Sequence, residues 1–75
     1  MQPYQDRDGD QTIIGYEDGL DFIRIHYADG AVLEFHASQV SAAHVINLRQ
    51  LARLQDGLQH YLTRFVNVRL ARRIR

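Results

Sequence analysis

Two Asp-Gly turns divide residues 12–36 into three β-rich runs, and this arrangement leaves few folds open to a chain of 75 residues. The runs read TIIGY, LDFIRIHY and AVLEFH, and they are rich in the β-branched and aromatic residues that strands favour. Asp-Gly between such runs is typical of a tight hairpin turn. We therefore predict a three-stranded antiparallel β-meander over residues 12–36.

The register of the second hairpin follows from the side-chain faces. A two-residue loop would place Ile25 opposite Glu34, so that an apolar side chain would share a face with a charged one. A three-residue loop, Ala28–Gly30, with Gly30 in the left-handed conformation, keeps apolar residues together. Because a one-residue shift moves every side chain to the other face, the three-residue loop is predicted. It pairs Ile25 with Leu33, Ile23 with Phe35, and Arg24 with Glu34.

The same reasoning at the first turn, Glu17–Gly19, sets Tyr16 opposite Leu20 and Ile14 opposite Phe22. In this register both faces of the sheet are apolar, although an antiparallel sheet commonly leaves one face polar. The first face carries Ile13, Ile23, Ile25, Tyr27, Leu33 and Phe35. The second face carries Arg24, His26 and Glu34 together with five candidate protein-interface residues: Ile14, Tyr16, Leu20, Phe22 and Val32.

A helix is predicted to follow the meander. Apolar residues recur at steps of three and four from Val45 to Phe65, as on one side of an amphipathic helix, and Ser41 is the expected N-cap. We predict one long helix over residues 41–63, packed across the first sheet face. Gly57 then marks a kink, because a glycine inside a helix costs only about 1 kcal/mol relative to alanine. The alternative is that Gly57 caps a helix that ends just before it.

The tail, residues 64–75, is compatible with two structures. Val66, Val68 and Leu70 alternate as in a strand, whereas Val66, Leu70 and Ile74 align on one side of a helix. The β-branched residues favour a fourth C-terminal strand at about residues 65–70, followed by a frayed basic end.

The first ten residues form an acidic head with three aspartates and no apolar periodicity, so we expect residues 1–10 to be flexible. A chain of this length supports one hydrophobic core. The prediction is a single α+β domain over residues 1–75, with a βββα or βββαβ order of elements.

The stretch from Asp6 to Glu17 has the oxygen pattern of an EF-hand calcium loop. Asp6, Asp8 and Asp10 fall at loop positions 1, 3 and 5, and Glu17 falls at position 12. Against calcium, Gln11 occupies the glycine position, only five residues precede Asp6, and a hairpin follows where a helix should. Aspartates also keep an edge strand soluble. No metal site is assigned, and calcium stays open as an alternative.

Catalytic chemistry finds little support in the sequence. The absence of cysteine excludes disulfides, thiolate metal sites and thiol nucleophiles. The four histidines lie too far apart in the predicted elements to share a metal ion. No phosphate-binding loop, dinucleotide fingerprint or nucleophile elbow occurs. We expect no enzyme, no cofactor and no small-molecule substrate.

The location expected from the sequence is cytoplasmic. No apolar run approaches the roughly 18 residues of a membrane span, and the polar start does not resemble a signal peptide. A membrane partner is therefore not expected.

Charge is strongly polarised although the net charge is zero. Residues 1–34 hold eight acids and two arginines, whereas residues 35–75 hold seven arginines and one acid. The two halves can neutralise each other within one fold or between two copies. The arginines of the tail could instead contact nucleic-acid phosphates, although a pI near 6.9 is low for a nucleic-acid binder. These candidates are Arg64, Arg69, Arg72, Arg73 and Arg75.

The segment GYEDGLDFIRIHYADGAVLEF, followed by a helix, resembles the small KTSC family. That family has Gly-Tyr-Asp, an apolar strand, a glycine turn, a second strand and then a helix. The resemblance covers residues 12–62 and includes the spacing from Gly15 to Gly30. No proline follows Val40, and QDGL stands where the family has a serine-glycine stretch. The resemblance implies a hairpin-plus-helix fold. The family is linked with nucleic-acid proteins without a settled role, so it implies no particular activity.

The sequence thus predicts binding and not catalysis. We expect a small protein-interaction module, a homodimeric regulator or inhibitor that acts by masking a partner surface. Its partner would be another protein, a second copy of itself, or both. Its working surface would be the second apolar sheet face. The alternative function is a nucleic-acid-binding module that uses the C-terminal arginines.

Overall fold

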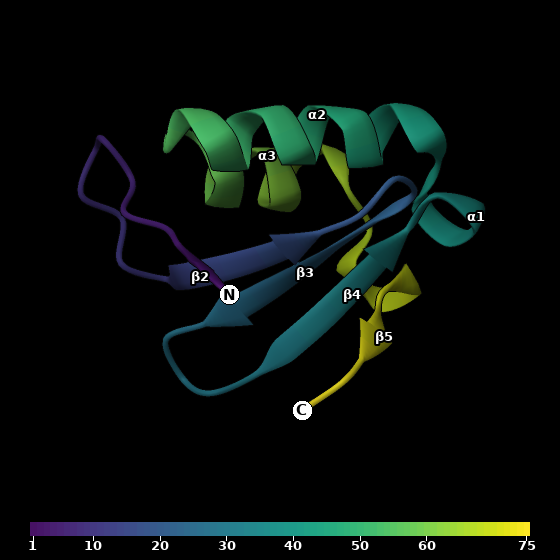
Figure 1. Cartoon of the computed structure of the whole chain (residues 1–75), viewed down its shortest axis with the longest axis horizontal. Helices are drawn as coiled ribbons and strands as arrows, with labels where there is room; N and C mark the ends of the chain where they lie inside the picture. The colour runs from purple at the N-terminus through teal and green to yellow at the C-terminus, as the bar shows by residue number, and fades with distance from the viewer.

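The computed structural model describes all 75 residues, and it places the two longer helices on one side of an antiparallel sheet (Figure 1). Five strands lie in the sheet in chain order, and each pairs antiparallel with its neighbours. The α+β class is confirmed. The meander forms the centre of the sheet, and one short strand is added at each edge. The strands are β1 (Gln2–Pro3), β2 (Ile13–Asp18), β3 (Phe22–Tyr27), β4 (Val32–His36) and β5 (Arg72–Arg73).

The hairpin between β3 and β4 has the predicted register. Ile25 lies opposite Leu33, and Ile23 lies opposite Phe35. Gly30 has a φ of +96°, the left-handed conformation that the three-residue loop requires. The alternation of apolar side chains was therefore sufficient to define this half of the sheet.

The predicted register of the first hairpin is wrong. The loop lies over residues 19–21, where the Gly19 amide donates to the Phe22 carbonyl at 3.0 Å. Tyr16 consequently lies opposite Ile25 and not opposite Leu20. A β-bulge between residues 13 and 15 lets Ile13 and Tyr16 both face the helices, whereas the intervening Ile14 stays 48% exposed.

The single long helix predicted over residues 41–63 is also wrong, because the chain breaks it into separate helices. Gln55 and Gly57 both adopt left-handed backbone conformations, with φ of 58° and 76°, which end one helix and precede the next. The predicted N-cap is confirmed, since the Ser41 hydroxyl accepts from the His44 amide at 3.2 Å. The helices are α1 (Ala37–Val40), α2 (Ala42–Leu54) and α3 (Leu58–Phe65).

The acidic head, which was expected to be flexible, packs against the body of the protein. β1 pairs with β2, and Tyr4 and Asp6 are buried. The Tyr4 hydroxyl donates to Asp6 and accepts from the Leu58 amide, and the Gly57 amide donates to Asp6. The head therefore supplies hydrogen-bonding partners to the backbone at the break between α2 and α3.

The tail forms a strand, but not at the predicted residues 65–70. α3 continues to Phe65, and a 3₁₀ helix, η1 (Val68–Leu70), follows it. The Asn67 side chain caps η1 by accepting from the Arg69 amide at 3.1 Å. This capped turn delays the strand until β5, which pairs with β4 at the edge of the sheet.

The hydrophobic core lies between the sheet and the helices (Figure 1). Its fully buried members come from the central strands and from α2 and α3. The largest are Ile13, Ile23, Ile25, Phe35, Leu48, Leu58 and Leu62. None of the helices has the combination of length and apolar character that crossing a membrane requires.

Candidate functional site

The outer face of the sheet, which is the face opposite to the helices, carries a row of charged residues. Glu17 lies opposite Arg24 in the neighbouring strand, Arg24 lies opposite Glu34, and Glu34 lies opposite Arg72. Cross-strand partners project from the same face. These four residues, called here the charged row, therefore cross β2, β3, β4 and β5 with signs that alternate from negative to positive.

Only part of the charged row is paired within the chain. Arg24 Nε donates to Glu34 Oε1 at 2.9 Å. Glu17 Oε1 lies 2.6 Å from His26 Nε2, and this hydrogen bond is the main cause of a lowered pKa for the Glu17 carboxyl. Arg72 forms no ion pair. One guanidinium at the end of the row thus remains available to an external carboxylate.

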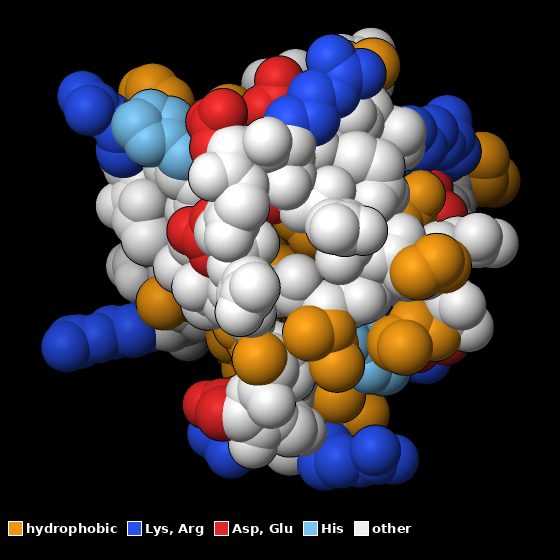
Figure 2. Space-filling view, turned by 90° about the vertical axis from the view of Figure 1, so that its left-hand side faces the viewer, with side chains coloured by type: hydrophobic (Ala, Val, Ile, Leu, Met, Phe, Trp, Pro, Cys, Tyr) orange, Lys and Arg blue, Asp and Glu red, His pale blue; other side chains and the backbone are white.

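Apolar side chains flank the charged row. On one side, Phe22 is partly exposed, and the Arg24 guanidinium lies 5.4 Å from its ring centroid. On the other side, Ile14 and Ile74 are 48% and 43% exposed. Figure 2 shows hydrophobic side chains gathered along the lower part of the molecule, which is the sheet side. The outer face therefore combines apolar contact area with ordered charge.

Val32 lies on the outer face as predicted, but it is not accessible. It is opposite His26 and only 4% exposed, and it is the one buried hydrophobic residue outside the core cluster. Backbone hydrogen bonds join it to Ile74 and Arg75. The end of the tail therefore lies along this part of β4.

The other predicted interface residues lie in three different environments. Tyr16 belongs to the core between sheet and helices, because the bulge in β2 turns it inward. Leu20 is at the tip of the first turn and is 94% exposed. Ile14 and Phe22 remain on the outer face with accessible surface. Sequence reasoning included Arg24 and Glu34 on this face, but it missed Glu17 and Arg72 as members of one row.

The five candidate arginines do not form a continuous strip. Arg64 is in the last turn of α3, and Arg69 is in η1. Within β5, Arg72 shares the outer face with Glu34, whereas Arg73 lies opposite Leu33 and faces the helix side. None of the five, Arg75 included, forms an ion pair.

Two other arginines are paired within the fold. Arg49 and Arg53 of α2 both contact the Asp18 carboxylate, at 3.0 and 3.2 Å. The opposite charges of the two chain halves thus meet in part within one molecule.

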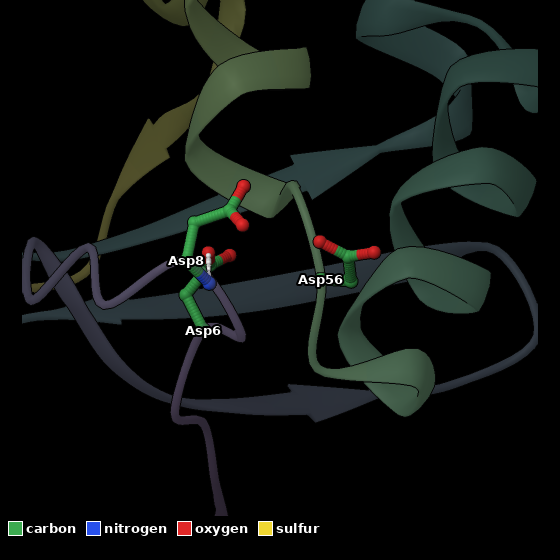
Figure 3. A group of neighbouring side chains, drawn as sticks. All are labelled: Asp6, Asp8 and Asp56. Atoms are coloured by element: carbon green, nitrogen blue, oxygen red, sulfur yellow. Dashed lines mark hydrogen bonds between the residues drawn. The ribbon is translucent and has the colours of Figure 1, made fainter.

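An acidic cluster of two head residues and Asp56 lies at the break between α2 and α3 (Figure 3). Asp6, Asp8 and Asp56 offer oxygen atoms within 4.8 Å of one another. Both oxygens of Asp6 already accept hydrogen bonds from the protein, from the Tyr4 hydroxyl and the Gly57 amide on one oxygen and from the Asp8 amide on the other. The Tyr4 hydrogen bond is the main cause of a lowered pKa for Asp6.

The ligands of the EF-hand pattern are not gathered in one place. The first, Asp6, is buried at the helix break, whereas the twelfth, Glu17, lies in β2 and bonds to His26 on the outer sheet face. The segment between them runs into a strand at Ile13. Asp6 therefore connects the head to the start of α3 through hydrogen bonds.

The comparisons with known proteins give no further assignment: no protein-family model, no curated protein and no solved structure matches this chain significantly. The resemblance to the KTSC family stays a prediction from the sequence.

Proposed function

We propose that this chain is a small non-catalytic protein-interaction module whose docking surface is the outer face of the sheet. The observation that carries the proposal is the charged row with the exposed Ile14 on one side and the partly exposed Phe22 on the other, on a face that α2 and α3 do not cover. Accessible apolar side chains next to ordered charges offer a partner both contact area and electrostatic complementarity. The module would act as a regulator or inhibitor by covering a surface of its partner.

The edges of the sheet favour docking on the face. β1 has only two residues and includes Pro3, which has no amide proton to donate. β5 also has two residues, both of them arginine. Short edges that carry proline or charge discourage the addition of a foreign strand. A partner is therefore expected to cover the outer face and not to extend the sheet.

A matched pair of isoleucines tests the docking surface. Ile14 on the outer face is 48% exposed, and Ile46 on α2 is 51% exposed. Ile14→Asp should weaken partner binding at least about tenfold, because the contact would bury an unpaired charge. Ile46→Asp should leave binding unchanged. Cross-linking and pull-down from the native host, with the wild type and both variants, measure the difference. Equal capture of the same protein by wild type and Ile14→Asp would contradict the proposal.

Nucleic-acid binding is the second candidate function, and the lack of ion pairs at the five tail arginines favours it. Phosphate binding by these arginines should weaken by about two orders of magnitude between about 50 and 200 mM salt. Fluorescence anisotropy with short DNA and RNA at the two salt concentrations measures this loss. Arg72→Ala and Arg73→Ala should each reduce the salt dependence. Binding that is absent or insensitive to salt removes this candidate.

A further inference from the structure

The charged row is complementary to itself when it is read backwards. Its order is Glu17, Arg24, Glu34, Arg72, or negative, positive, negative, positive. The reverse order is positive, negative, positive, negative. Two such rows laid on each other in opposite directions therefore bring every charge onto an opposite charge.

We propose that the outer face binds the outer face of a second copy of this chain. The two copies are related by a two-fold axis that lies in the interface, runs parallel to the strands and passes between β3 and β4. The inference rests on the proposed function, because it names the occupant of that docking surface. The axis reverses the order of the strands but keeps positions along them. Glu17 then lies over Arg72 of the second copy, and Arg24 lies over Glu34 of the second copy. Such a contact is isologous, as in most homodimers.

The charged row disfavours the other face-to-face two-fold arrangement. An axis perpendicular to the strands would keep the order of the row, so Arg24 would lie over Arg24 of the second copy and Glu34 over Glu34. Like charges at close range disfavour an interface. Two stacked sheets commonly align their strands within about 30°. The arrangement with opposite charges in contact satisfies both requirements.

The apolar residues beside the charged row match in the same arrangement. Gly15, His26 and Val32 are consecutive cross-strand partners, and Ile74 bonds to Val32 through the backbone. Ile14 precedes Gly15 in the bulge of β2. Reversal of the strand order places Ile14 over Ile74 of the second copy. Two half-exposed aliphatic side chains are then buried at each end of the interface, where they contribute apolar contact.

The second copy also provides what Arg72 lacks within its own chain. Its guanidinium forms no ion pair, whereas Glu17 has one oxygen that no hydrogen bond uses. The two residues meet across the two-fold axis. The Arg24–Glu34 pairs of the two copies lie over each other as a group of four alternating charges. Since exposed ion pairs contribute little affinity, the charges determine the register and the apolar residues supply the attraction.

Two single charge reversals test this register. In Arg24→Glu, residue 24 would face the unchanged Glu34 of an identical copy, so like charges meet. In Glu34→Arg, residue 34 would face the unchanged Arg24, with the same result. In a mixed dimer of these two variants, every position in the row meets an opposite charge. We expect each variant alone to dimerise at least about tenfold more weakly than the wild type. The equimolar mixture should recover dimerisation to within about threefold of the wild type.

Sedimentation equilibrium over a range of concentrations measures the dissociation constants of the wild type, the two variants and their mixture, and native mass spectrometry identifies the mixed dimer. Both variants lose the Arg24–Glu34 pair within the chain, and mixing cannot restore that pair. Recovery on mixing therefore reports a contact between copies and not a repair of folding. Arg64→Glu is the matched control, because it makes the same change of charge on α3, away from the outer face. It should dimerise like the wild type.

Three results would overturn the inference: a wild type that stays monomeric at all concentrations, single variants that dimerise as well as the wild type, or a mixture that shows no recovery. The proposed function is tested by a different result from the one that tests the dimer. If the wild type is monomeric but Ile14→Asp abolishes capture of a different protein, the docking surface stands and its occupant is that protein.

Discussion

Replacement of Asp6 with alanine is expected to lower the free energy of unfolding by about 3 kcal/mol, a large share of the stability of a small domain. The buried carboxylate accepts hydrogen bonds from the Tyr4 hydroxyl at 2.6 Å and from the Gly57 amide at 2.8 Å. Asp6→Ala leaves both donors without an acceptor. It also removes one of the contacts that hold the head on the break between α2 and α3. Urea unfolding followed by circular dichroism measures the loss.

Asp8→Ala is the matched control for this prediction. Asp8 is exposed, and only its backbone amide bonds to Asp6. Its removal should change the free energy of unfolding by less than about 0.5 kcal/mol. Equal effects of the two substitutions would show that Asp6 contributes only negative charge and not the hydrogen bonds described here.

The pH dependence of stability further separates the hydrogen-bonding role of Asp6 from a contribution of its negative charge alone. Because the Tyr4 hydrogen bond lowers the pKa of Asp6, the folded state favours the ionised carboxylate. This contribution is present above the ordinary carboxyl pKa and is lost as the pH falls through the lowered value. Asp6→Ala should therefore lose less stability in acid than the wild type does. If the stabilities of the wild type and of Asp6→Ala fall in parallel as the pH decreases, the assignment of this hydrogen bond to Asp6 is contradicted.

Phe35→Ala is expected to destabilise the protein by about 4 kcal/mol, because a large side chain is removed from a core that cannot collapse around it. Phe35 is 0% exposed and lies opposite Ile23 on the helix side of the sheet. Thermal and urea unfolding measure this effect. A protein that no longer folds at 25 °C would also agree with the prediction.

Phe22→Ala is the control, since it makes the same substitution on the neighbouring strand but on the outer face. Phe22 is partly exposed and contacts the Arg24 guanidinium. Its loss should cost about 1 kcal/mol. The difference between the two variants reports which face of the sheet is covered by helices. A larger effect at Phe22 than at Phe35 would mean that the faces are reversed.

The parts of the fold that were predictable from the sequence depend on short-range patterns. The β3–β4 hairpin follows from alternation of apolar side chains and from one glycine that can adopt a positive φ, Gly30. The start of α2 follows from Ser41, whose hydroxyl bonds to an amide three residues later. Each of these signals acts between residues that are close in sequence or directly opposite in one hairpin.

The first hairpin shows where such patterns fail. An Asp-Gly dipeptide predicted a loop at residues 17–19, yet β2 continues through Asp18. Glu17 is held by His26, and Asp18 is held by Arg49 and Arg53 of α2. Charge partners on another strand and on a helix thus support two acidic residues in the strand. The bulge that turns Tyr16 inward is likewise invisible to strict alternation.

The candidate site was predictable only in part for the same reason. Arg24 and Glu34 belong to the correctly predicted hairpin, so their pairing on one face could be derived. Glu17 enters the charged row through the register of the first hairpin, and Arg72 enters it through the late start of β5. Neither position could be placed before the tertiary structure was known.

The amino-acid sequence was sufficient to define the α+β class, the second hairpin and the helix N-cap. Apolar periodicity, the positive φ of a glycine and capping hydrogen bonds all act over a few residues. Tertiary structure alone decided that the helix breaks at Gln55–Gly57, that the head is packed and that four charges align across the outer face. The physical reason is distance along the chain: the amide of Gly57 finds its acceptor in Asp6, 51 positions earlier, and no local pattern encodes such a bond.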